Sequence, residues 1–502
     1  ARWESDGLYQ QLRDARADRE KFIFHDGPPY ANGDMHIGHA LNHTLKDMVC
    51  RTQNLLGKNA PYVPGWDCHG LPIEWKVEEQ YRKKKLDKKA VPAKEFRAEC
   101  RAYAQHWVDV QREQLKRLGI MADWDYPYLT MQFDSEATIV AELMKFAEAG
   151  NLYRGSKPVM WSPVEETALA EAEVEYEDIT STQIDVAFEI TESPIKELVG
   201  AHAVIWTTTP WTIPVNQALA YGPEIEYALC EVVVGASVEG EASLSEALDT
   251  HPLAAWVGKR VLVASSLQET VEKRLDTAFG EQWRVALKEV STIKGSELAG
   301  TVARHPMHEL GGFYAKPRPF LPGDFVTTDS GTGLVHMSPD HGEDDFLLCR
   351  KHGIEPVFAV MADGRYRDDW EWLGAGDVDA DGKERRRSVI NKPFNSPEGP
   401  ICSDLREAGG LLSASDDYQH SYPHSWRSKA KVIYRCTPQW FVPMDKPLGA
   451  PEVPVLRQAQ DERGGEQAAD TPSAQPEPVE GHALPSTLRE RALQAIADTR
   501  FV

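Results

Sequence analysis

The sequence predicts an α/β fold that is interrupted by a long β-rich insert. Up to about residue 150, short apolar runs alternate with helix-period patterns, which is typical of a parallel sheet with connecting helices. From residue 186 to about 328, the pattern changes to β-branched runs between turn residues. Helical spacing returns at about 404–412. The change of pattern indicates that two architectures follow one another along the chain.

The elements before residue 150 follow in a clear order. An apolar run at 22–25 predicts a short buried strand, and a loop rich in glycine and proline follows at 27–33. Apolar residues at helical spacing predict a helix over 37–48. Another short strand is expected at 61–65, and helices are expected over most of 95–150. The order strand, loop, helix is typical of a parallel α/β sheet.

Composition excludes several classes of protein. The 502 residues suggest roughly three domains. The sequence contains no run of about 18 apolar residues, so no membrane span is expected. A net charge of −23 argues against a protein that coats nucleic acid by charge alone, and the basic run at 82–97 is typical of a solvated helical face. The seven cysteines form no Cys-x-x-Cys pair, which indicates a reducing cytoplasm and no disulfide framework.

The end of the chain has a different composition. Residues 449–483 are rich in Pro, Gln, Glu, Ala and Gly and poor in large apolar side chains, so we expect a disordered or loosely packed insertion. A helix is expected over 488–497. The sequence then stops at Val502, in what we expect to be the middle of a domain.

The first chemical motif is His36-Ile37-Gly38-His39, which opens the helix after the loop. The two histidines are three residues apart and therefore share one helix face. The helix N-terminus supplies free N–H groups and a positive dipole end, and Gly38 has no side chain to hinder a flat base. We therefore expect a nucleoside triphosphate site, with histidine donors for the phosphate oxygens. Without the preceding loop, two histidines at a helix start would indicate no ligand.

These residues resemble a known family. The loop at 27–33, with the four-residue motif after it, is similar to the HIGH signature of class I aminoacyl-tRNA synthetases, and its Tyr-Ala-Asn-Gly wording resembles the isoleucine enzymes. The stretch at 61–74 strengthens the resemblance. In the family, the counterparts of Gly27, Pro28 and Asp67 contact the amino acid, which implies that Asp67 binds the substrate ammonium. A turn-capping aspartate is the alternative for Asp67.

A second motif is the hydroxyl-rich stretch at 206–216. Its three consecutive threonines, Thr207, Thr208 and Thr209, can hold an ester carbonyl, a water and a ribose hydroxyl by hydrogen bonds. A β-branched edge strand is the alternative, because threonine favours strands. The stretch resembles the threonine-rich peptide of the editing domain in isoleucyl, valyl and leucyl enzymes, and we expect Asn216 to belong to the same site.

The third motif, at residues 331–345, contains four possible metal ligands: His336, His341, Asp344 and Asp345. Their spacing fits no zinc pattern, so no metal is expected. The resemblance places the stretch in the editing pocket. There the counterpart of His336 lines the side-chain pocket, and that of Asp345 binds the amino group of the misacylated residue. Ser338 stands where the usual wording has alanine.

The stretch from 422 to 441 resembles the strand pair by which the family's chain returns to the catalytic domain. The resemblance implies that Trp426 packs on the isoleucine side chain, and ordinary core is the alternative for the aromatic residues of this stretch. Many relatives have cysteines where Ser425 and Ser428 stand, so no zinc site is expected here.

The resemblance implies a Rossmann-like parallel-sheet catalytic domain that is split by a β-rich, β-barrel-like editing insertion. We expect a first catalytic half at 1–153, a connecting ribbon at 154–185 and the editing domain at 186–395. The chain then returns to the catalytic domain at 396–448, continues through the low-complexity insertion at 449–483 and ends in a truncated catalytic segment at 484–502. The resemblance covers nearly the whole chain but only about half of a full-length family member.

The implied reaction is the attachment of isoleucine to its tRNA through isoleucyl-adenylate, with hydrolytic editing of valyl-tRNA. ATP with Mg²⁺, L-isoleucine and tRNA are the expected partners, and a cytoplasmic monomer is expected. No Lys-Met-Ser-Lys-Ser-like stretch occurs, and the family's anticodon-binding region is also missing. Three alternatives remain: a valyl or leucyl enzyme, another nucleotidyltransferase with a HIGH motif, or a chain competent only for tRNA binding or deacylation.

Overall fold

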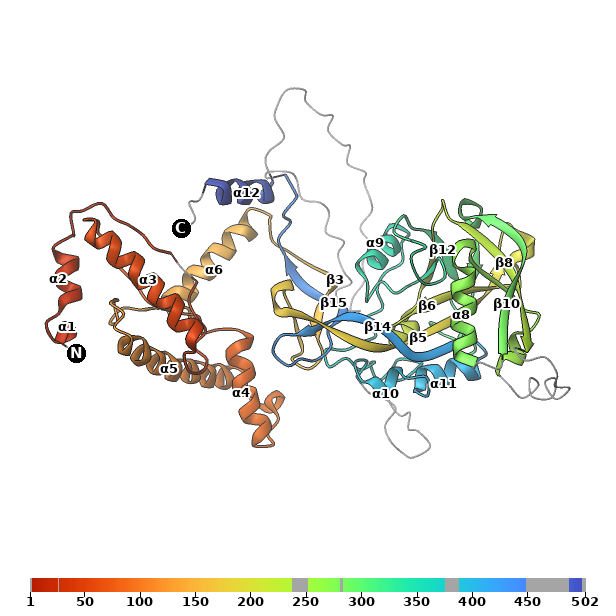
Figure 1. Ribbon diagram of the computed structural model, residues 1–502, viewed down its shortest axis with the longest axis horizontal. Helices are drawn as coiled ribbons and strands as arrows, with labels where there is room; N and C mark the ends of the chain where they lie inside the picture. Colours follow the sequence, from red (N-terminus) through yellow and green to blue (C-terminus); the bar gives the residue numbers. More distant parts are fainter. Residues whose placement is uncertain are drawn as a thin grey trace, which may run out of the picture. The chain divides into compact units, whose positions relative to one another are not determined.

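The computed structural model forms two compact units (Figure 1). Unit 1 comprises residues 1–153 and 441–502, and unit 2 comprises residues 154–440. The expected insertion at 449–483 lies outside the residues that the structure describes. The described residues are 2–25, 27–236, 252–279, 283–374, 388–447 and 487–498.

Unit 1 is mainly helical and carries a small parallel sheet. Its helices are α1 (Arg2–Ser5), α2 (Leu8–Asp14), α3 (Ile37–Leu55), α4 (Leu71–Lys83), α5 (Ala93–Arg117), α6 (Phe133–Glu148) and α12 (Leu488–Asp498). Strands β1 (Gly65–Trp66) and β2 (Tyr128–Leu129) pair in parallel. The helices expected over 37–48 and 95–150 are confirmed, whereas β1 is much shorter than the strand expected at 61–65.

The expected strand at 22–25 does not form. Only an isolated parallel bridge joins Lys21 to Asn59. The facing segment contains Pro61 and Pro64, which have no backbone N–H to extend a ladder of hydrogen bonds. The parallel bridge and the β1–β2 pair are nevertheless what an α/β unit requires, so the predicted fold class is confirmed in kind.

Unit 2 is built on one large mixed sheet. The strand order is β10-β8-β9-β6-β5-β11-β12-β7-β13, and β14 also pairs with β5. These strands are β5 (Val174–Glu192), β6 (His202–Thr207), β7 (Ala218–Tyr221), β8 (Glu226–Ala236), β9 (Arg260–Ala264), β10 (Trp283–Lys294), β11 (Val302–Ala303), β12 (Arg318–Pro322), β13 (Leu334–Met337) and β14 (Leu411–Ser425). The predicted β-rich insert is confirmed.

Smaller elements complete unit 2. A second sheet has the order β15-β3-β4, from β15 (Ile433–Phe441), β3 (Tyr153–Ser162) and β4 (Thr167–Ala168). The helices are α8 (Gln268–Phe279), α9 (Glu343–Lys351), α10 (Lys392–Asn395) and α11 (Pro400–Glu407), and a 3-10 helix, η4, spans Pro210–Val215. The helical signal expected near 404–412 corresponds to α11.

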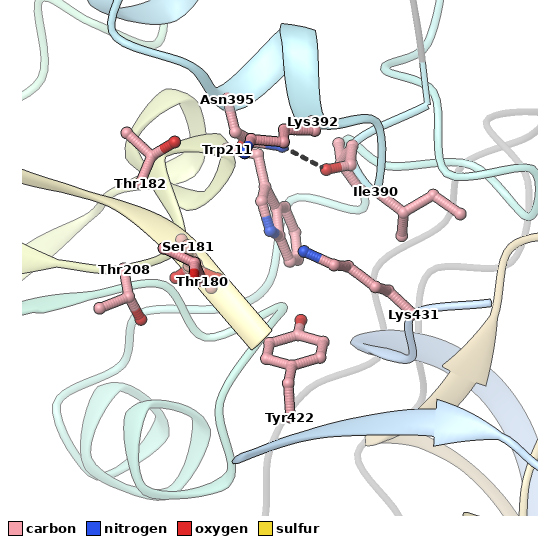
Figure 2. A pocket seen from close by; sticks show the side chains of 12 residues that line it. Thr180, Ser181, Thr182, Thr208, Trp211, Ile390, Lys392, Asn395, Tyr422 and Lys431 are labelled. Carbon is pink, nitrogen blue, oxygen red and sulfur yellow. Dashed lines mark hydrogen bonds between the residues drawn. The ribbon is translucent and has the colours of Figure 1, made fainter. Parts of the chain in front are cut away.

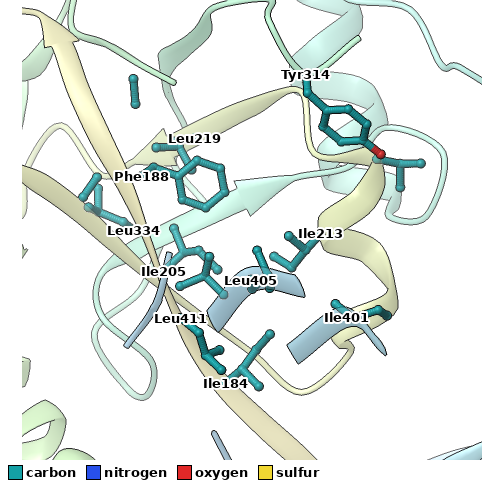
Figure 3. Close-up of a cluster of buried hydrophobic side chains, with 14 of the residues drawn as sticks. Ile184, Phe188, Ile205, Ile213, Leu219, Tyr314, Leu334, Ile401, Leu405 and Leu411 are labelled. Carbon is teal, nitrogen blue, oxygen red and sulfur yellow. The ribbon is translucent and has the colours of Figure 1, made fainter. Parts of the chain in front are cut away.

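The long strands β5 and β14 run side by side as an antiparallel ribbon (Figure 1). The boundaries expected at 185/186 and 395/396 fall inside unit 2. The first is crossed by β5 without a break. Near the second, Ile401 and Leu405 of α11 pack into the same core as Ile184 and Ile205 (Figure 3). A continuous strand and a shared core explain why the chain does not divide there.

The described part of the chain offers neither an activated thiol nor a helix that could span a membrane. All seven cysteines are free, and burial raises the pKa of their thiols, that of Cys68 to about 11, so they are poor nucleophiles. Within the described ranges, no helix is both long and apolar enough to cross a membrane.

A buried ion pair joins α8 to the ribbon. Asp185 of β5 is 1% exposed. Arg274 donates to its two carboxylate oxygens at 2.7 and 3.1 Å. Ser413 of β14 donates to the same carboxylate at 2.6 Å, and Arg274 also donates to the carbonyl oxygen of Gly331 at 3.1 Å. The pair therefore holds four segments of unit 2 together.

We expect Asp185→Asn to lower the free energy of unfolding of unit 2 by about 3–5 kcal/mol, because it leaves the guanidinium of Arg274 buried without a countercharge. Chemical denaturation measures this change. The control is Glu189→Gln, which breaks the more exposed pair with Arg304 and is expected to cost roughly 0–1 kcal/mol. Equal losses in the two variants would show that the Asp185 pair contributes nothing special.

Candidate functional site

The HIGH motif begins helix α3 with a reciprocal cap. The Nδ1 atom of His36 accepts the N–H of Gly38 at 3.1 Å, and the Nδ1 atom of His39 accepts the N–H of His36 at 3.3 Å. The two rings lie 3.9 Å apart between centroids. The pair therefore satisfies backbone donors at the helix N-terminus.

This cap sets the tautomer of both rings. A neutral imidazole whose Nδ1 accepts a hydrogen bond carries its proton on Nε2. Neither Nε2 atom has a partner among the described residues, so His36 and His39 present two free N–H donors at one helix start. Burial and the neighbouring His36 lower the pKa of His39, which favours the neutral form of this ring at pH 7.

The geometry of the cap gives a reason for glycine at position 38 that could not be seen in the sequence. A Cβ atom at this position would lie 3.0 Å from Cε1 and 3.1 Å from Nδ1 of His36. That approach is closer than ordinary van der Waals contact, so any side chain at position 38 would displace the His36 ring. Glycine is therefore needed for the cap itself, in addition to any approach of a ligand.

Three of the four residues expected to contact the amino acid, Gly27, Pro28 and Asp67, lie in unit 1. A Cβ atom at Gly65 would lie 3.3 Å from Cβ of Pro28, so the loop after Gly27 packs on β1. Backbone hydrogen bonds of 2.8 Å join Asp67 to the same loop on both sides, at Pro29 and Ala31. The loop and the aspartate are thus held in a fixed relation.

The Asp67 carboxylate has no cationic partner among the described residues. Its Oδ1 atom accepts the backbone N–H of His69 at 3.2 Å and the hydroxyl of Thr130 at 3.4 Å. No lysine, arginine or histidine among the described residues pairs with it, and the side chain is half-buried. The bond to His69 is the turn cap foreseen as the alternative, and it leaves Oδ2 open for an ammonium group.

In unit 2, the threonine peptide forms a chain of hydroxyl groups at the end of β6. The hydroxyls of Thr207 and Thr209 are 3.1 Å apart, and those of Thr209 and Thr212 are 3.5 Å apart. The Thr212 hydroxyl also donates to the carbonyl oxygen of Thr209 at 2.9 Å. Thr208 lies between them, and its hydroxyl has no partner in the described chain. The peptide is therefore a turn into η4 and does not continue as an edge strand.

His336 meets this peptide across 124 residues of sequence. Its Nε2 atom lies 3.0 Å from the hydroxyl of Thr212. Because that hydroxyl gives its proton to Thr209, His336 must be the donor, and its Nδ1 is a bare acceptor. Nδ1 is buried and has no partner in the described residues. Burial, with a smaller contribution from His341, lowers the pKa of His336 to about 4, so the ring is neutral at pH 7.

Asp345 lies in the first turn of α9 and joins the same cluster through Ser338. Its Oδ2 atom accepts the backbone N–H of Ser338 at 2.7 Å, and the Ser338 hydroxyl donates to the carbonyl oxygen of Thr212 at 3.1 Å. Burial raises the pKa of Asp345 to about 7. Serine in place of the usual alanine therefore adds a tie between the two motifs.

Asn216 ends the threonine peptide and is fully buried. Its amide nitrogen donates to the carbonyl oxygen of Ala218 at 2.9 Å. Its Oδ1 atom has no hydrogen-bond partner in the part of the chain that the structure describes. A buried acceptor left open costs free energy unless a ligand or water satisfies it.

The remaining polar residues of the third motif are occupied elsewhere. Nδ1 of His341 donates to the carbonyl oxygen of Tyr434, 2.7 Å away, and its ring stands edge-on to Trp211. Asp344 is exposed. Across the described ranges, no three His, Cys, Asp or Glu side chains gather closely enough to hold a metal ion.

Trp426 lies in the turn after β14, in unit 2. Its backbone N–H donates to the carbonyl oxygen of Glu173 at 3.0 Å, and the guanidinium of Arg427 stacks 3.8 Å from its ring centroid. Beside it, the buried carboxylate of Glu165 accepts the Ser425 hydroxyl at 2.7 Å and the backbone N–H of Ser428 at 3.1 Å. The Glu165 carboxylate thus ties Ser425 to Ser428.

Comparison with known proteins shows the family. The family model described as tRNA synthetases class I (I, L, M and V) matches residues 1–462. The chain belongs to this family. That result removes the alternative of an unrelated nucleotidyltransferase with a HIGH motif.

Curated members of the synthetase family match the chain closely. A protein named isoleucine--tRNA ligase from Zymomonas mobilis is 58% identical over 89% of this chain and 43% of its own length. Proteins of the same name from Gluconobacter oxydans and Caulobacter vibrioides are 50% and 45% identical, over 89% and 99% of this chain and 44% and 45% of theirs. The chain therefore spans less than half the length of these relatives.

Two polar residues of this synthetase chain, Thr212 and Gln111, were not predicted from the sequence. Thr212 carries the contact to His336 but was not singled out among the threonines. On α5, the buried amide of Gln111 donates to the carbonyl oxygens of Tyr30 and Gly33 at 3.2 and 2.7 Å and accepts the indole N–H of Trp66 at 2.8 Å. The only sequence signal for Gln111 is a glutamine among the apolar positions of a helix.

Proposed function

We propose that this chain is the front part of an enzyme that joins isoleucine to its tRNA through isoleucyl-adenylate, and that unit 2 hydrolyses valyl-tRNA made in error. The observation that carries the proposal is the contact between Thr212 and His336. It brings the threonine peptide and the Asp345 helix to one cluster of polar groups. The similarity to isoleucine--tRNA ligases supports isoleucine over valine or leucine as the substrate.

The activating part uses unit 1. ATP, with Mg²⁺, is the expected nucleotide, and the free Nε2–H groups of His36 and His39 are donors for its phosphate oxygens as pyrophosphate leaves. The open oxygen of Asp67 is an acceptor for the ammonium of L-isoleucine. Trp426 is proposed to pack on the isoleucine side chain. We place this reaction in the cytoplasm, in line with the free cysteines, and propose that the protein is a monomer.

For the activating part, we expect Asp67→Ala to raise the KM for isoleucine by roughly 10- to 100-fold in isoleucine-dependent pyrophosphate exchange, which is the effect of losing one charged hydrogen bond. The assay needs a protein that continues to the length of the relatives, because this chain contains no Lys-Met-Ser-Lys-Ser-like stretch. The exposed Asp125→Ala is the control and should change nothing. An unchanged KM in Asp67→Ala refutes the ammonium assignment.

The hydrolytic part is needed because isoleucine and valine differ by one methylene, which is worth only about 0.8 kcal/mol of burial. We propose that the Asp345 carboxylate binds the ammonium of the misplaced valine and that the threonine hydroxyls hold the ester and a water. Neutral His336 forms the wall that limits the size of the side chain. The cluster contains no activated nucleophile, so water attacks the ester without a covalent enzyme intermediate.

The direct test is the rate at which the purified chain releases valine from valyl-tRNA, compared with the spontaneous rate under the same conditions. Acceleration supports the hydrolytic part, and a rate equal to the spontaneous one refutes it. Release of valine by a Thr209→Ala, Thr212→Ala double variant at the unsubstituted rate would show that the hydrolysis comes from elsewhere in the chain. This assay is independent of the activation assay, because it needs neither ATP nor unit 1.

Hydrolysis should depend on pH through Asp345. Its pKa is raised to about 7, so the carboxyl is protonated below that pH and cannot pair with an ammonium. We therefore expect kcat/KM for valyl-tRNA to fall about tenfold for each pH unit below 7 and to level off above it. The Asp345→Asn variant should be slow and insensitive to pH in this range. An unsubstituted chain with a flat profile from pH 5.5 to 8 contradicts the prediction.

A further inference from the structure

A hollow beside the threonine peptide has a charge that the proposed hydrolysis does not use. It encloses about 450 Å³ of empty space, including open solvent, between the ribbon, η4 and the segment around α10 (Figure 2). Its walls are Thr180, Ser181, Thr182, Thr208, Thr209, Trp211, Val389, Ile390, Lys392, Asn395, Tyr422 and Lys431. These residues include two lysines and no carboxylate, in a chain whose net charge is −23.

Neither lysine of the hollow is neutralised. Lys392 and Lys431 form no ion pair within the described residues. Lys431 lies over the ring of Tyr422, 5.4 Å from its centroid, and points toward Trp211 (Figure 2). Burial and the charge of Lys392 lower the pKa of Lys431. Both lysines line the same hollow. An anion in that space would relieve the repulsion between them.

The neighbouring Lys429 shows what an ordinary surface lysine does here. It is exposed, and its amine pairs with Glu175 on the facing strand of the ribbon. Lys431 is only two residues further along but lies half-buried on the other side of the chain, without a carboxylate. Lys429 therefore belongs to a solvated surface ion pair, whereas Lys431 lines the hollow without an ion pair among the described residues.

Hydroxyl groups complete the lining of the hollow. The hydroxyls of Thr180 and Thr208 have no hydrogen-bond partner in the described chain and are free to donate. That of Ser181 is bound to Nε2 of His420 at 2.9 Å. Two ammonium groups with free hydroxyl donors match the oxygens of a phosphate. The set does not suit a metal ion, since it offers no anionic ligand.

We propose that Lys392 and Lys431 bind a backbone phosphate of the single-stranded 3′ end of tRNA, while the terminal ester lies at Thr208 and Thr209. Both threonines line the hollow, and the Thr209 hydroxyl also belongs to the hydroxyl chain, so one strand end can reach both. The inference rests on the proposed hydrolysis and adds the group that anchors its substrate. A free phosphate ion shares the same chemistry and is separated by the experiment.

The experiment measures binding of a 5′-labelled, single-stranded RNA octamer ending in CCA-3′ to the full chain, by fluorescence anisotropy at several salt concentrations. We expect Lys392→Gln and Lys431→Gln each to weaken binding roughly tenfold. Each should also reduce the slope of log affinity against log salt by about 0.7, the value for one lost contact to a single-strand phosphate. Lys431→Arg should largely restore both, which separates charge from folding. Lys429→Gln, which removes the same charge two residues away, should change neither.

Three results decide between the sources of the phosphate. Equal binding and salt slope in all the glutamine variants overturns the proposal. Displacement of the RNA by inorganic phosphate at low millimolar concentration from the unsubstituted chain, but not from a Lys392→Gln, Lys431→Gln double variant, also overturns it in favour of a free phosphate site. Weaker RNA binding in the double variant, with no displacement by phosphate, supports it. Because no ester is cleaved, this outcome is independent of whether the chain hydrolyses valyl-tRNA.

Discussion

Replacing Asp345 with Ala is expected to reduce kcat/KM for valyl-tRNA hydrolysis by about 10²- to 5 × 10³-fold, because a charged contact made in a desolvated site is worth roughly 3–5 kcal/mol. The carboxylate lies at the start of α9, is held by the N–H of Ser338, and has a pKa raised to about 7 by burial. A group kept in that state is poised to gain from a cation. Initial rates on valyl-tRNA at pH 7.5 measure the loss.

The control for this variant is Asp344→Ala. It removes the same charge from the adjacent, exposed position of the same helix turn. It should keep nearly the full rate. If Asp344→Ala and Asp345→Ala lose the same activity, the effect comes from the charge of the helix start and not from a contact with the substrate. Removing this half-buried carboxylate relieves its desolvation, so Asp345→Ala is expected to fold.

Replacing His336 with Ala is expected to raise the rate of isoleucyl-tRNA hydrolysis by about 5- to 150-fold, since forcing one additional methylene into a full pocket costs roughly 1–3 kcal/mol. The imidazole is buried, neutral and fixed by Thr212 at 3.0 Å, so it is a rigid wall. Hydrolysis of valyl-tRNA should change much less. The measurement is the ratio of the two rates in the same preparation.

His352→Ala, at an exposed histidine after α9, is the matched control and should leave this ratio unchanged. His336→Ala removes a hydrogen bond from Thr212 and leaves a cavity, so its melting temperature is recorded beside the rates. A folded His336→Ala variant that still discards isoleucyl-tRNA as slowly as the parent would remove His336 from the selectivity of the site.

Features that depend on a few neighbouring residues could be predicted from the sequence. The loop before His36 and the helical spacing after it are local, and α3 begins at the expected place. The β-rich texture after residue 186 likewise predicted the character of unit 2. The strand predicted from the apolar run at 22–25 was wrong, because a strand needs a pairing partner and the facing segment contains prolines.

Contacts between distant segments could not be predicted in the same way. His336 reaches Thr212 because β13 pairs with β7 in a register that sets His336 opposite Leu219. No periodicity in either segment reveals that register. Gln111 holds a loop 78 to 81 residues away in the chain, and only its burial distinguishes it from a surface glutamine. The proximity of Lys392 and Lys431 in the hollow depends on the folded ribbon, so it could not be predicted from the sequence either.

The central claim is that this chain holds a hydrolytic site built to tell valine from isoleucine on tRNA. The measurement that tests it most directly is kcat/KM of the unsubstituted chain on valyl-tRNA and on isoleucyl-tRNA, prepared from the same tRNA and assayed side by side at pH 7.5. We expect faster release of valine, with the preference reduced in His336→Ala and release itself lost in Asp345→Ala. Equal release of the two amino acids, or release of neither above the spontaneous rate, would contradict it.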